Sequence, residues 1–174
     1  MSPEVPLSAI EKLNSRHIVE NFKCGKNSLD LFIRRHALKN QVADSSQTYV
    51  VHRDNVVVGY YSLVYSEVVL ADCPEEVREK MPSAFPVPVM RFARFAVVKS
   101  EQGQGIGRSL LKDAFARTLA AARIAGLRAI VVDAIEDEMV DFYKKLGFIK
   151  CPITARALMI PVQTVRDSLT EVST

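Results

Sequence analysis

The sequence predicts an α/β fold with a mixed central sheet flanked by helices on both faces. Apolar runs rich in β-branched and aromatic residues alternate with segments of helical periodicity along the chain. One of these runs, at about 89–98, leads into a glycine-rich turn that opens directly into an amphipathic helix. The second half has the order strand, helix, strand, helix, strand, which is typical of parallel pairing at the centre of a sheet.

The length of 174 residues fits one domain with a substantial core. We expect a single domain over 1–174, with a core at about 20–160 and a polar C-terminal tail at 162–174. The net charge of +3 is too small to indicate a nucleic-acid partner by itself. The cysteines form no CxxC pair, residues 1–15 have no signal-peptide pattern, and charges interrupt the longest apolar runs. These features predict a soluble cytoplasmic protein with free thiols.

The N-terminal half is predicted to form one helix and a β-hairpin. Residues 1–26 show little periodicity and end in a turn at Cys24-Gly25-Lys26. Asn27 or Ser28 is expected to cap a helix that extends to about Lys39. The runs at 49–52 and 56–64 are expected to pair through a turn at 53–55. The apolar face of the helix comprises Leu29, Phe32, Ile33, His36 and Ala37.

The C-terminal half supplies the remaining elements. Gly126 is the expected stop signal of a long helix, and the tail after Pro161 is expected to be partly helical. Helices are expected at 74–81, 105–125 and 136–146, and strands at 89–98, 128–134, 147–149 and 157–160.

The most informative segment is the glycine-rich turn between the strand at 89–98 and the helix at 105–125. Residues 101–111 are Glu-Gln-Gly-Gln-Gly-Ile-Gly-Arg-Ser-Leu-Leu. Such a turn presents backbone N–H groups and the positive end of the helix dipole beyond the strand, where a phosphate is the natural ligand. The turn lacks the Gly-Lys-Ser/Thr ending of a Walker loop and the Gly-x-Gly-x-x-Gly order of a dinucleotide-binding loop.

The order of these segments resembles the GNAT acetyltransferase superfamily over about residues 40–160. Phe-Ala-Val at 95–97 precedes Gln-x-x-Gly-x-Gly at 102–107, and a long helix and a strand then lead to Phe-Tyr-x-x-x-Gly-Phe at 142–148. The resemblance implies acetyl-CoA as cosubstrate. It implies that the backbone of Phe95, Ala96 and Val97 holds the pantetheine arm, and that the pyrophosphate is wrapped by Gln102, Gly103, Gln104, Gly105, Ile106, Gly107, Arg108 and Ser109. Arg108 is equally well interpreted as a solvated helix residue.

Tyr143 is the expected catalytic residue. The resemblance implies that a tyrosine on this helix lies beside the sulfur of the cofactor, and direct acetyl transfer releases coenzyme A as a thiolate. A phenol with a pKa of about 10 is protonated at neutral pH and can donate that proton. The alternative is an amphipathic tyrosine that fills the seam between helix and sheet.

Neither a dedicated base nor a metal site is indicated. Acids at 136–138 are expected for dipole reasons alone, because they begin a predicted helix. An α-amine with a pKa of about 7.7–8.0 is partly neutral near pH 7, whereas a lysine at about 10.4 is almost fully charged, so α-amines are the easier substrates without a base. His17, His36 and His52 share no ligand spacing, and His36 is expected to be packed on the apolar helix face.

The N-terminal half extends the resemblance to GNAT toxins of bacterial toxin–antitoxin modules. The pattern Phe-x-Cys-Gly-x-x-x-Leu-x-x-Phe at 22–32 is similar to their opening, and segments 58–63, 81–82 and 93–97 match as well. The resemblance, now over residues 20–160, implies acetylation of the amino-acid α-amine on charged tRNA, which stops translation. It also implies a ribbon–helix–helix antitoxin, operator DNA bound only through that antitoxin, and a homodimer.

Basic residues are compatible with a tRNA substrate. Between residues 16 and 54, seven Lys or Arg stand against four acids. Contacts with phosphates give affinity without sequence choice. Arg94 is the first candidate for a tRNA contact because it lies inside the motif that matches the toxins. Arg91 stands where these toxins more usually have an apolar residue, so its role is in doubt. The full set of candidates is Arg34, Arg35, Lys39, Arg91 and Arg94. The alternative is a solvated helix face with arginines that pair with acids.

Two other functions remain open. One is a GNAT enzyme that acetylates a small amine or a protein lysine. The other is a degenerate GNAT module that serves as the partner of an antitoxin and DNA without catalysis. The complete loop at 102–107 and the presence of Tyr143 argue against degeneracy.

Overall fold

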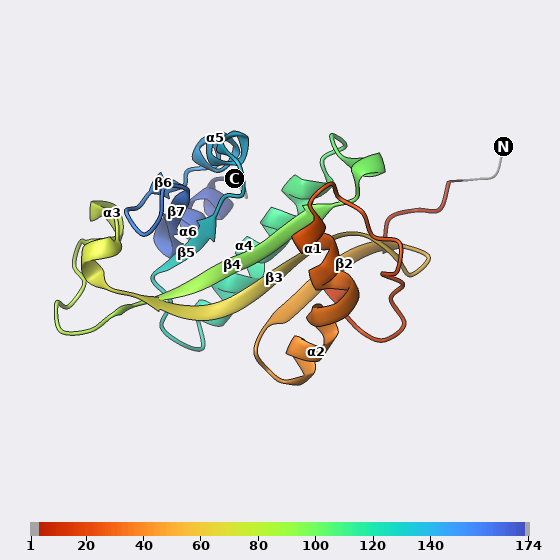
Figure 1. Cartoon of the computed structure of the whole chain (residues 1–174). Coiled ribbons are helices and arrows are strands. Elements are labelled where there is room, and N and C mark those ends of the chain that lie inside the picture. Colours follow the sequence, from red (N-terminus) through yellow and green to blue (C-terminus); the bar gives the residue numbers. More distant parts are fainter. Residues whose placement is uncertain (1–3, 173–174) are drawn as a thin grey trace. The chain divides into compact units, whose positions relative to one another are not determined.

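The structure, a computed structural model, describes residues 4–172 (Figure 1). Its strands form a mixed sheet in the hydrogen-bonded order β1-β2-β3-β4-β5-β7-β6. The chain divides into two compact units, which comprise Met1–Val64 with Ala93–Ala114, and Tyr65–Phe92 with Phe115–Thr174. The strands β3 and β4 and the helix α4 pass from one unit into the other.

The first unit contains the N-terminal helices, the β-hairpin and the segment that begins the long helix. Its elements are β1 (Glu11–Lys12), α1 (Asn27–Leu31), η1 (Phe32–His36), α2 (Ala37–Val42), β2 (Gln47–Arg53), most of β3 (Val56–Val68), the end of β4 (Val87–Val97), η3 (Lys99–Glu101) and the first half of α4 (Ile106–Ala122).

The hairpin of β2 and β3 forms as predicted. Asp54 and Asn55 make its two-residue turn with φ of 47° and 70°, a left-handed conformation that Asp and Asn tolerate. Successive side chains of β3 point to opposite faces. The Tyr60 hydroxyl donates a hydrogen bond to the Leu29 carbonyl of α1, and the Tyr61 hydroxyl donates one to Asp113 of α4. Helices therefore cover both faces of this hairpin.

The helix predicted at 27–39 is interrupted by a π-helical turn. The segment consists of α1, the π turn η1 and α2, and it ends at Val42 rather than Lys39. Neither Asn27 nor Ser28 caps it, because both lie inside α1, and Lys26 at the N-cap makes no side-chain capping bond. The wide π turn shifts the helical phase. His36 is consequently exposed, and its predicted packing on the apolar face is wrong.

The second unit contains the predicted parallel pair. β4 runs parallel to β5 (Ala129–Asp133), with Val89 opposite Ala129 and Phe92 opposite Val132. β5 pairs antiparallel with β7 (Ala157–Pro161), which also pairs with β6 (Ile149–Lys150). The other elements are η2 (Leu70–Asp72), α3 (Glu75–Arg78), α5 (Asp137–Lys145) and α6 (Val162–Val172).

The C-terminal segment is a packed helix rather than a polar tail. α6 contacts β5 and β7, and it buries Val162 and Val165, which are 3% and 1% exposed. Residues 173–174 of the predicted tail lie outside the described part of the chain. Val162 and Val165 are spaced at i and i+3 and so lie on one face of the helix. The overall polar composition of the segment does not reveal this pattern.

The cysteines are free thiols, as expected, with Cys73 and Cys151 buried. Among residues 4–172, no helix has both the length and the apolar character needed to cross a bilayer.

Gly59 allows α4 to pack closely on β3. A Cβ atom at this position would lie 3.1 Å from Leu110 Cδ1, 3.2 Å from Val51 Cγ1 and 3.3 Å from Ile106 Cγ2. Overpacking of this kind costs about 1–3 kcal/mol. We therefore expect Gly59→Ala to lower the free energy of unfolding by about that amount in urea denaturation. Gly126→Ala is the matched control, because a Cβ there meets nothing within 4 Å. Equal stability of the two variants would contradict this account.

Candidate functional site

The glycine-rich loop of the first unit has the geometry of an anion-binding site. β4 ends at Val97, η3 follows, and α4 begins at Ile106. Gly103 and Gly105 have φ of 81° and 87°, a conformation that favours glycine, and nothing lies within 4 Å of a Cβ at either position. Residues 102–105 are exposed. The loop before α4 is thus open to solvent, and the first N–H groups of a helix, which have no partner within the helix, can bind a phosphate there.

Gly107 has a different role from Gly103 and Gly105. A Cβ at Gly107 would lie 3.1 Å from Cζ of the Phe95 ring, so this glycine lets the first turn of α4 pack against β4. The structure therefore brings Phe95, predicted to hold the pantetheine arm, into contact with the predicted pyrophosphate loop. Ala96 and Val97 beside it are buried.

The side chain of Gln102 joins this loop to the Cys24–Gly25 turn. Its Nε2 donates hydrogen bonds to the carbonyls of Val97 and Cys24, both at 2.9 Å. The backbone N–H of Lys99 also donates to the Lys23 carbonyl at 2.9 Å. Sequence reasoning assigned Gln102 to the pyrophosphate and missed this connection, for which the sequence holds no local signal.

Tyr143, the predicted catalytic residue, lies on α5 in the second unit. Its side chain is 4% exposed and packs edge-to-face with Phe142 and Phe148, with ring centroids 5.4 Å and 5.2 Å away. Burial raises the pKa of the Tyr143 phenol well above its usual value. The hydroxyl is therefore protonated near neutral pH, which is the form that can donate a proton.

The predicted RNA-binding residues differ in what they contact. Arg34 is half-buried and donates to the Phe22 carbonyl, and Arg91 pairs with Asp133 at 3.2 Å. Arg94 is exposed, with its guanidinium carbon 4.2 Å from the centre of the Phe32 ring, a cation–π contact. Arg35 and Lys39 are exposed on η1 and α2. Arg94, Arg35 and Lys39 are thus better placed for phosphate contacts than Arg34 and Arg91.

A groove of about 630 Å³ lies beside η3 in the first unit. Its floor is apolar and includes Val56, Val57, Val58 and Val98, and the N-terminal segment contributes Val5 and Ile18. Arg53, which pairs with Glu101 at 2.8 Å, lines it as well. This ion pair links the tip of the hairpin to the segment that leads into the loop.

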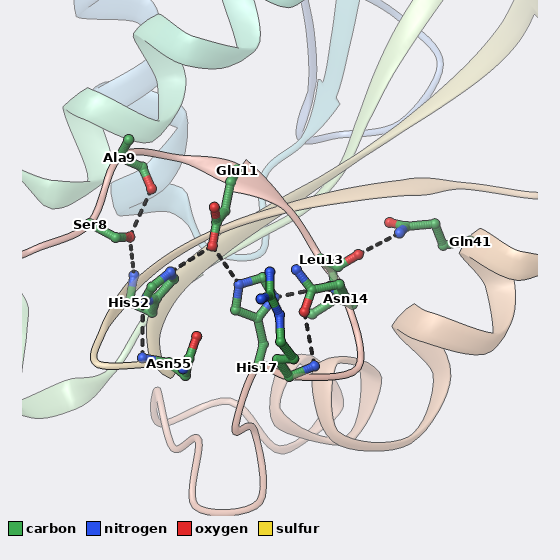
Figure 2. Close-up of polar contacts among 10 residues, drawn as sticks. Ser8, Ala9, Glu11, Leu13, Asn14, His17, Gln41, His52 and Asn55 are labelled. Carbon is green, nitrogen blue, oxygen red and sulfur yellow. Dashed lines mark hydrogen bonds and ion pairs between the residues drawn. The ribbon is translucent and has the colours of Figure 1, made fainter.

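Two histidines and a glutamate meet where the N-terminal segment pairs with β2 (Figure 2). Glu11 Oε1 accepts hydrogen bonds from Nε2 of His17 at 2.8 Å and of His52 at 2.7 Å. These two donors lower the pKa of the Glu11 carboxyl. Sequence spacing does not reveal this cluster, because strand pairing brings residue 52 beside residue 11.

The hydrogen bonds at Nδ1 determine what this cluster can bind. Nδ1 of His17 accepts the Asn14 backbone N–H, and Nδ1 of His52 accepts that of Asn55, both at 3.0 Å (Figure 2). Both rings therefore carry their proton on Nε2 and donate it to Glu11. The three ligand atoms lie within 4.8 Å of one another, and two His with one Glu are a zinc-type set. Metal bound at Nε2, however, requires the proton on Nδ1, where each ring already faces an N–H donor.

We therefore expect that Zn²⁺ does not bind to this cluster. A ligand that binds the folded state raises its thermal stability. A tenfold excess of Zn²⁺ should leave the midpoint of thermal unfolding unchanged, measured by circular dichroism. A Zn²⁺-dependent rise that disappears in His52→Ala would contradict this expectation.

Comparison with known proteins adds family information. Residues 44–150 match the acetyltransferase (GNAT) domain family. The chain is 41% identical over 159 residues to a tRNA-acetylating toxin of Mycobacterium tuberculosis (strain ATCC 25618 / H37Rv), covering 91% of this chain and 95% of that protein.

Two solved structures are similar along nearly the whole chain. The structure of AtaT complexed with acetyl-methionyl-tRNAfMet has a TM-score of 0.86 and 27% identity, covering 94% of this chain and 99% of that one. An AtaT mutant bound to the C-terminus of the antitoxin AtaR and acetyl-CoA has a TM-score of 0.79 and 26% identity, covering 95% and 99%. The sheet order, the loop at the start of α4 and these matches agree, and the chain belongs to the GNAT acetyltransferase family.

Proposed function

We propose that this protein is the toxin of a toxin–antitoxin pair, which transfers acetyl from acetyl-CoA to the α-amine of aminoacyl-tRNA and so blocks translation. The similarity to the tRNA-acetylating toxin carries the proposal. It extends over 159 residues, whereas the GNAT domain match is confined to 44–150, so it also includes sequence outside the acetyl-CoA-binding domain. The AtaT complex with acetyl-methionyl-tRNAfMet supports the same class of acceptor.

The donor site is formed by the end of β4 and the start of α4. The exposed backbone at Gly103–Gly105 and the helix N-terminus bind the pyrophosphate, and the backbone at 95–97 binds the pantetheine arm. Gln104 lies between the two glycines, and residues 106–109 form the first turn of α4 beside the pyrophosphate. Both units act together as one GNAT domain.

The acceptor is an α-amine because it needs no dedicated base. Its pKa of about 7.7–8.0 leaves part of it neutral near pH 7, whereas a lysine at about 10.4 is almost entirely charged. The neutral amine attacks the thioester carbonyl, the C–S bond breaks, and Tyr143 protonates the leaving thiolate. The proton that the attacking nitrogen loses passes through solvent and restores the Tyr143 phenol. Exposed Arg94, Arg35 and Lys39 contact RNA phosphates.

The test is acetylation of purified substrates. The protein is incubated with radiolabelled acetyl-CoA and charged tRNA, and the amino acid is then released and examined for an N-acetyl group. Uncharged tRNA, polyamines and a lysine peptide are tested in parallel. We expect label on charged tRNA only. Label on a polyamine or on the peptide alone would establish the small-amine or lysine alternative, and no label on any substrate would favour a non-catalytic module.

Tyr143→Phe tests the general acid. Loss of a positioned proton donor costs about 10²–10⁴-fold in rate. We expect kcat to fall by about 100-fold or more, with acetyl-CoA affinity by calorimetry nearly unchanged. Tyr65→Phe is the control, since it removes the hydroxyl of an exposed tyrosine in the same unit.

The raised pKa of Tyr143 adds a pH dependence to this test. The phenol is protonated below its pKa, so raising that pKa extends the donor form to higher pH. The rate of the wild-type enzyme should therefore show no loss from Tyr143 up to a pH of about 10, the usual phenol value. A fully active Tyr143→Phe variant would refute the role.

Arg94→Ala tests the phosphate contact. We expect KM for charged tRNA to rise. The slope of log KM against log salt concentration should also become smaller by the contribution of about one phosphate contact, because counterion release scales with the number of contacts. Arg91→Ala should have a smaller effect, since Arg91 pairs with Asp133. The reverse order of the two effects would contradict this assignment.

The proposed partners follow from the toxin assignment. The AtaT mutant bound to the C-terminus of AtaR supports an antitoxin that binds this chain. We propose a ribbon–helix–helix antitoxin that carries the operator DNA contact, and a cytoplasmic homodimeric toxin. Co-expression with the product of an adjacent short gene, followed by size-exclusion chromatography, tests both assemblies.

A further inference from the structure

We propose that Gln102 is a positioning residue that couples the acetyl-CoA loop to the N-terminal helical segment, so that acetyl-CoA binding orders the Cys24–Gly25 turn before the acceptor arrives. The proposal rests on the proposed function, because it assigns acetyl-CoA to this loop and the acceptor contacts to Arg94 and the segment α1–η1–α2.

The side-chain amide nitrogen of Gln102 forms its hydrogen bonds within the protein. A side-chain amide nitrogen carries two hydrogens. Each of them is donated to a carbonyl of a different segment, Val97 at the end of β4 and Cys24 in the turn. The Nε2 hydrogens are therefore engaged in the protein, and Gln102 contributes to ligand binding by holding the loop in position.

The connection continues from the turn into α1. The backbone N–H of Cys24 donates to Oδ1 of Asp30 at 2.8 Å, and Asp30 is 5% exposed in the first turn of α1. The turn itself depends on Gly25, with φ of 103°. The loop is thus joined through Gln102, Cys24 and Asp30 to the helix that precedes Phe32.

The end of this connection is a residue of the proposed acceptor site. Phe32 begins the π turn η1, and Arg94 lies over its ring. The Tyr60 hydroxyl holds the preceding turn of the helix through the Leu29 carbonyl. Ordering of α1 therefore fixes the surface on which the Arg94 guanidinium rests.

Binding energy at the loop can act on this connection because the loop is open to solvent and therefore to a ligand. Residues 102–105 are exposed, and Gly103 and Gly105 have no close neighbours at the Cβ position. A bound pyrophosphate fixes this backbone, and the two hydrogen bonds of Gln102 transmit the restraint to Cys24. Coupling between two sites is reciprocal, so a restraint on the turn also strengthens acetyl-CoA binding.

Gln41 offers a matched control within the same unit. Its carboxamide also bridges two backbone groups, donating to the Leu13 carbonyl at 2.7 Å and accepting from the Thr48 N–H at 3.0 Å. Gln41→Met and Gln102→Met thus remove the same side-chain group and the same number of hydrogen bonds. Only the second affects the loop.

The experiment measures acetyl-CoA affinity by calorimetry and backbone amide hydrogen exchange with and without acetyl-CoA. In the wild-type protein, acetyl-CoA should slow exchange at the amides of Cys24 and Lys99. Gln102→Met should weaken acetyl-CoA binding by about five- to tenfold, the effect of roughly one net hydrogen bond, and abolish the slowing at Cys24. Gln41→Met should lower the midpoint of thermal unfolding about as much as Gln102→Met does. It should leave the affinity for acetyl-CoA within about twofold of the wild-type value.

A second pair of variants acts on the turn from the side opposite the loop. Asp30→Leu removes the acceptor for the Cys24 N–H and should also weaken acetyl-CoA binding, although Asp30 is separated from the loop by the turn. Asp30→Asn keeps an oxygen acceptor at this position and should restore the affinity.

The outcomes separate this proposal from the proposed function. Wild-type affinity in Gln102→Met, or weakened affinity without acetyl-CoA-dependent protection of Cys24 in the wild type, overturns the coupling. Failure to acetylate charged tRNA while acetyl-CoA still protects Cys24 overturns the acceptor assignment alone. Absence of acetyl-CoA binding to the wild-type protein overturns both.

Discussion

The proposed donor site depends on where α4 begins. Within the first unit, two glycines determine this point, since Gly59 leaves room on β3 for Ile106 and Leu110, and Gly107 leaves room for the Phe95 ring. Backbone N–H groups at a helix N-terminus have directions set by the helix axis, so an ångström of displacement in the helix is an ångström of displacement in every donor. The site is therefore built by packing beneath the loop, while the loop residues themselves remain in solvent.

Cationic side chains in this chain divide into those that hold the fold and those that are available to a ligand. Arg34 binds a backbone carbonyl, and Arg53 and Arg91 pair with Glu101 and Asp133. Arg94 instead rests on an aromatic ring, which limits the rotamers of its long side chain, while the residue as a whole remains exposed. A net charge of +3 does not distinguish these roles, because it counts paired and unpaired charges alike.

Much of the fold follows from local sequence, because strands and helices with strong periodicity are recognisable without tertiary information. The hairpin turn at Asp54-Asn55, the parallel strand before the loop and the start of α4 were all predictable from turn chemistry and hydrophobic pattern. The features that were not predictable arise from contacts between distant segments. The Glu11 cluster requires the pairing of β1 with β2, and the Gln102 bridge spans 78 positions of sequence. The π turn at 32–36 is hidden because a periodic pattern with one added residue still looks helical over short windows.

The π turn is equivalent to a single-residue insertion in an otherwise regular helix. A π turn takes about one residue more than an α turn, so the extra residue is absorbed within η1. Deletion of one residue from 32–36 would therefore restore a continuous α-helix and leave Ala37 buried in the core of the first unit and Lys39 exposed. If the same residues were instead wound as a regular α-helix, everything after them would rotate by about 100° relative to α1, one residue's share of a turn of 3.6. The winding of this segment, rather than its composition, therefore determines which side chains the second half of the helix presents to solvent.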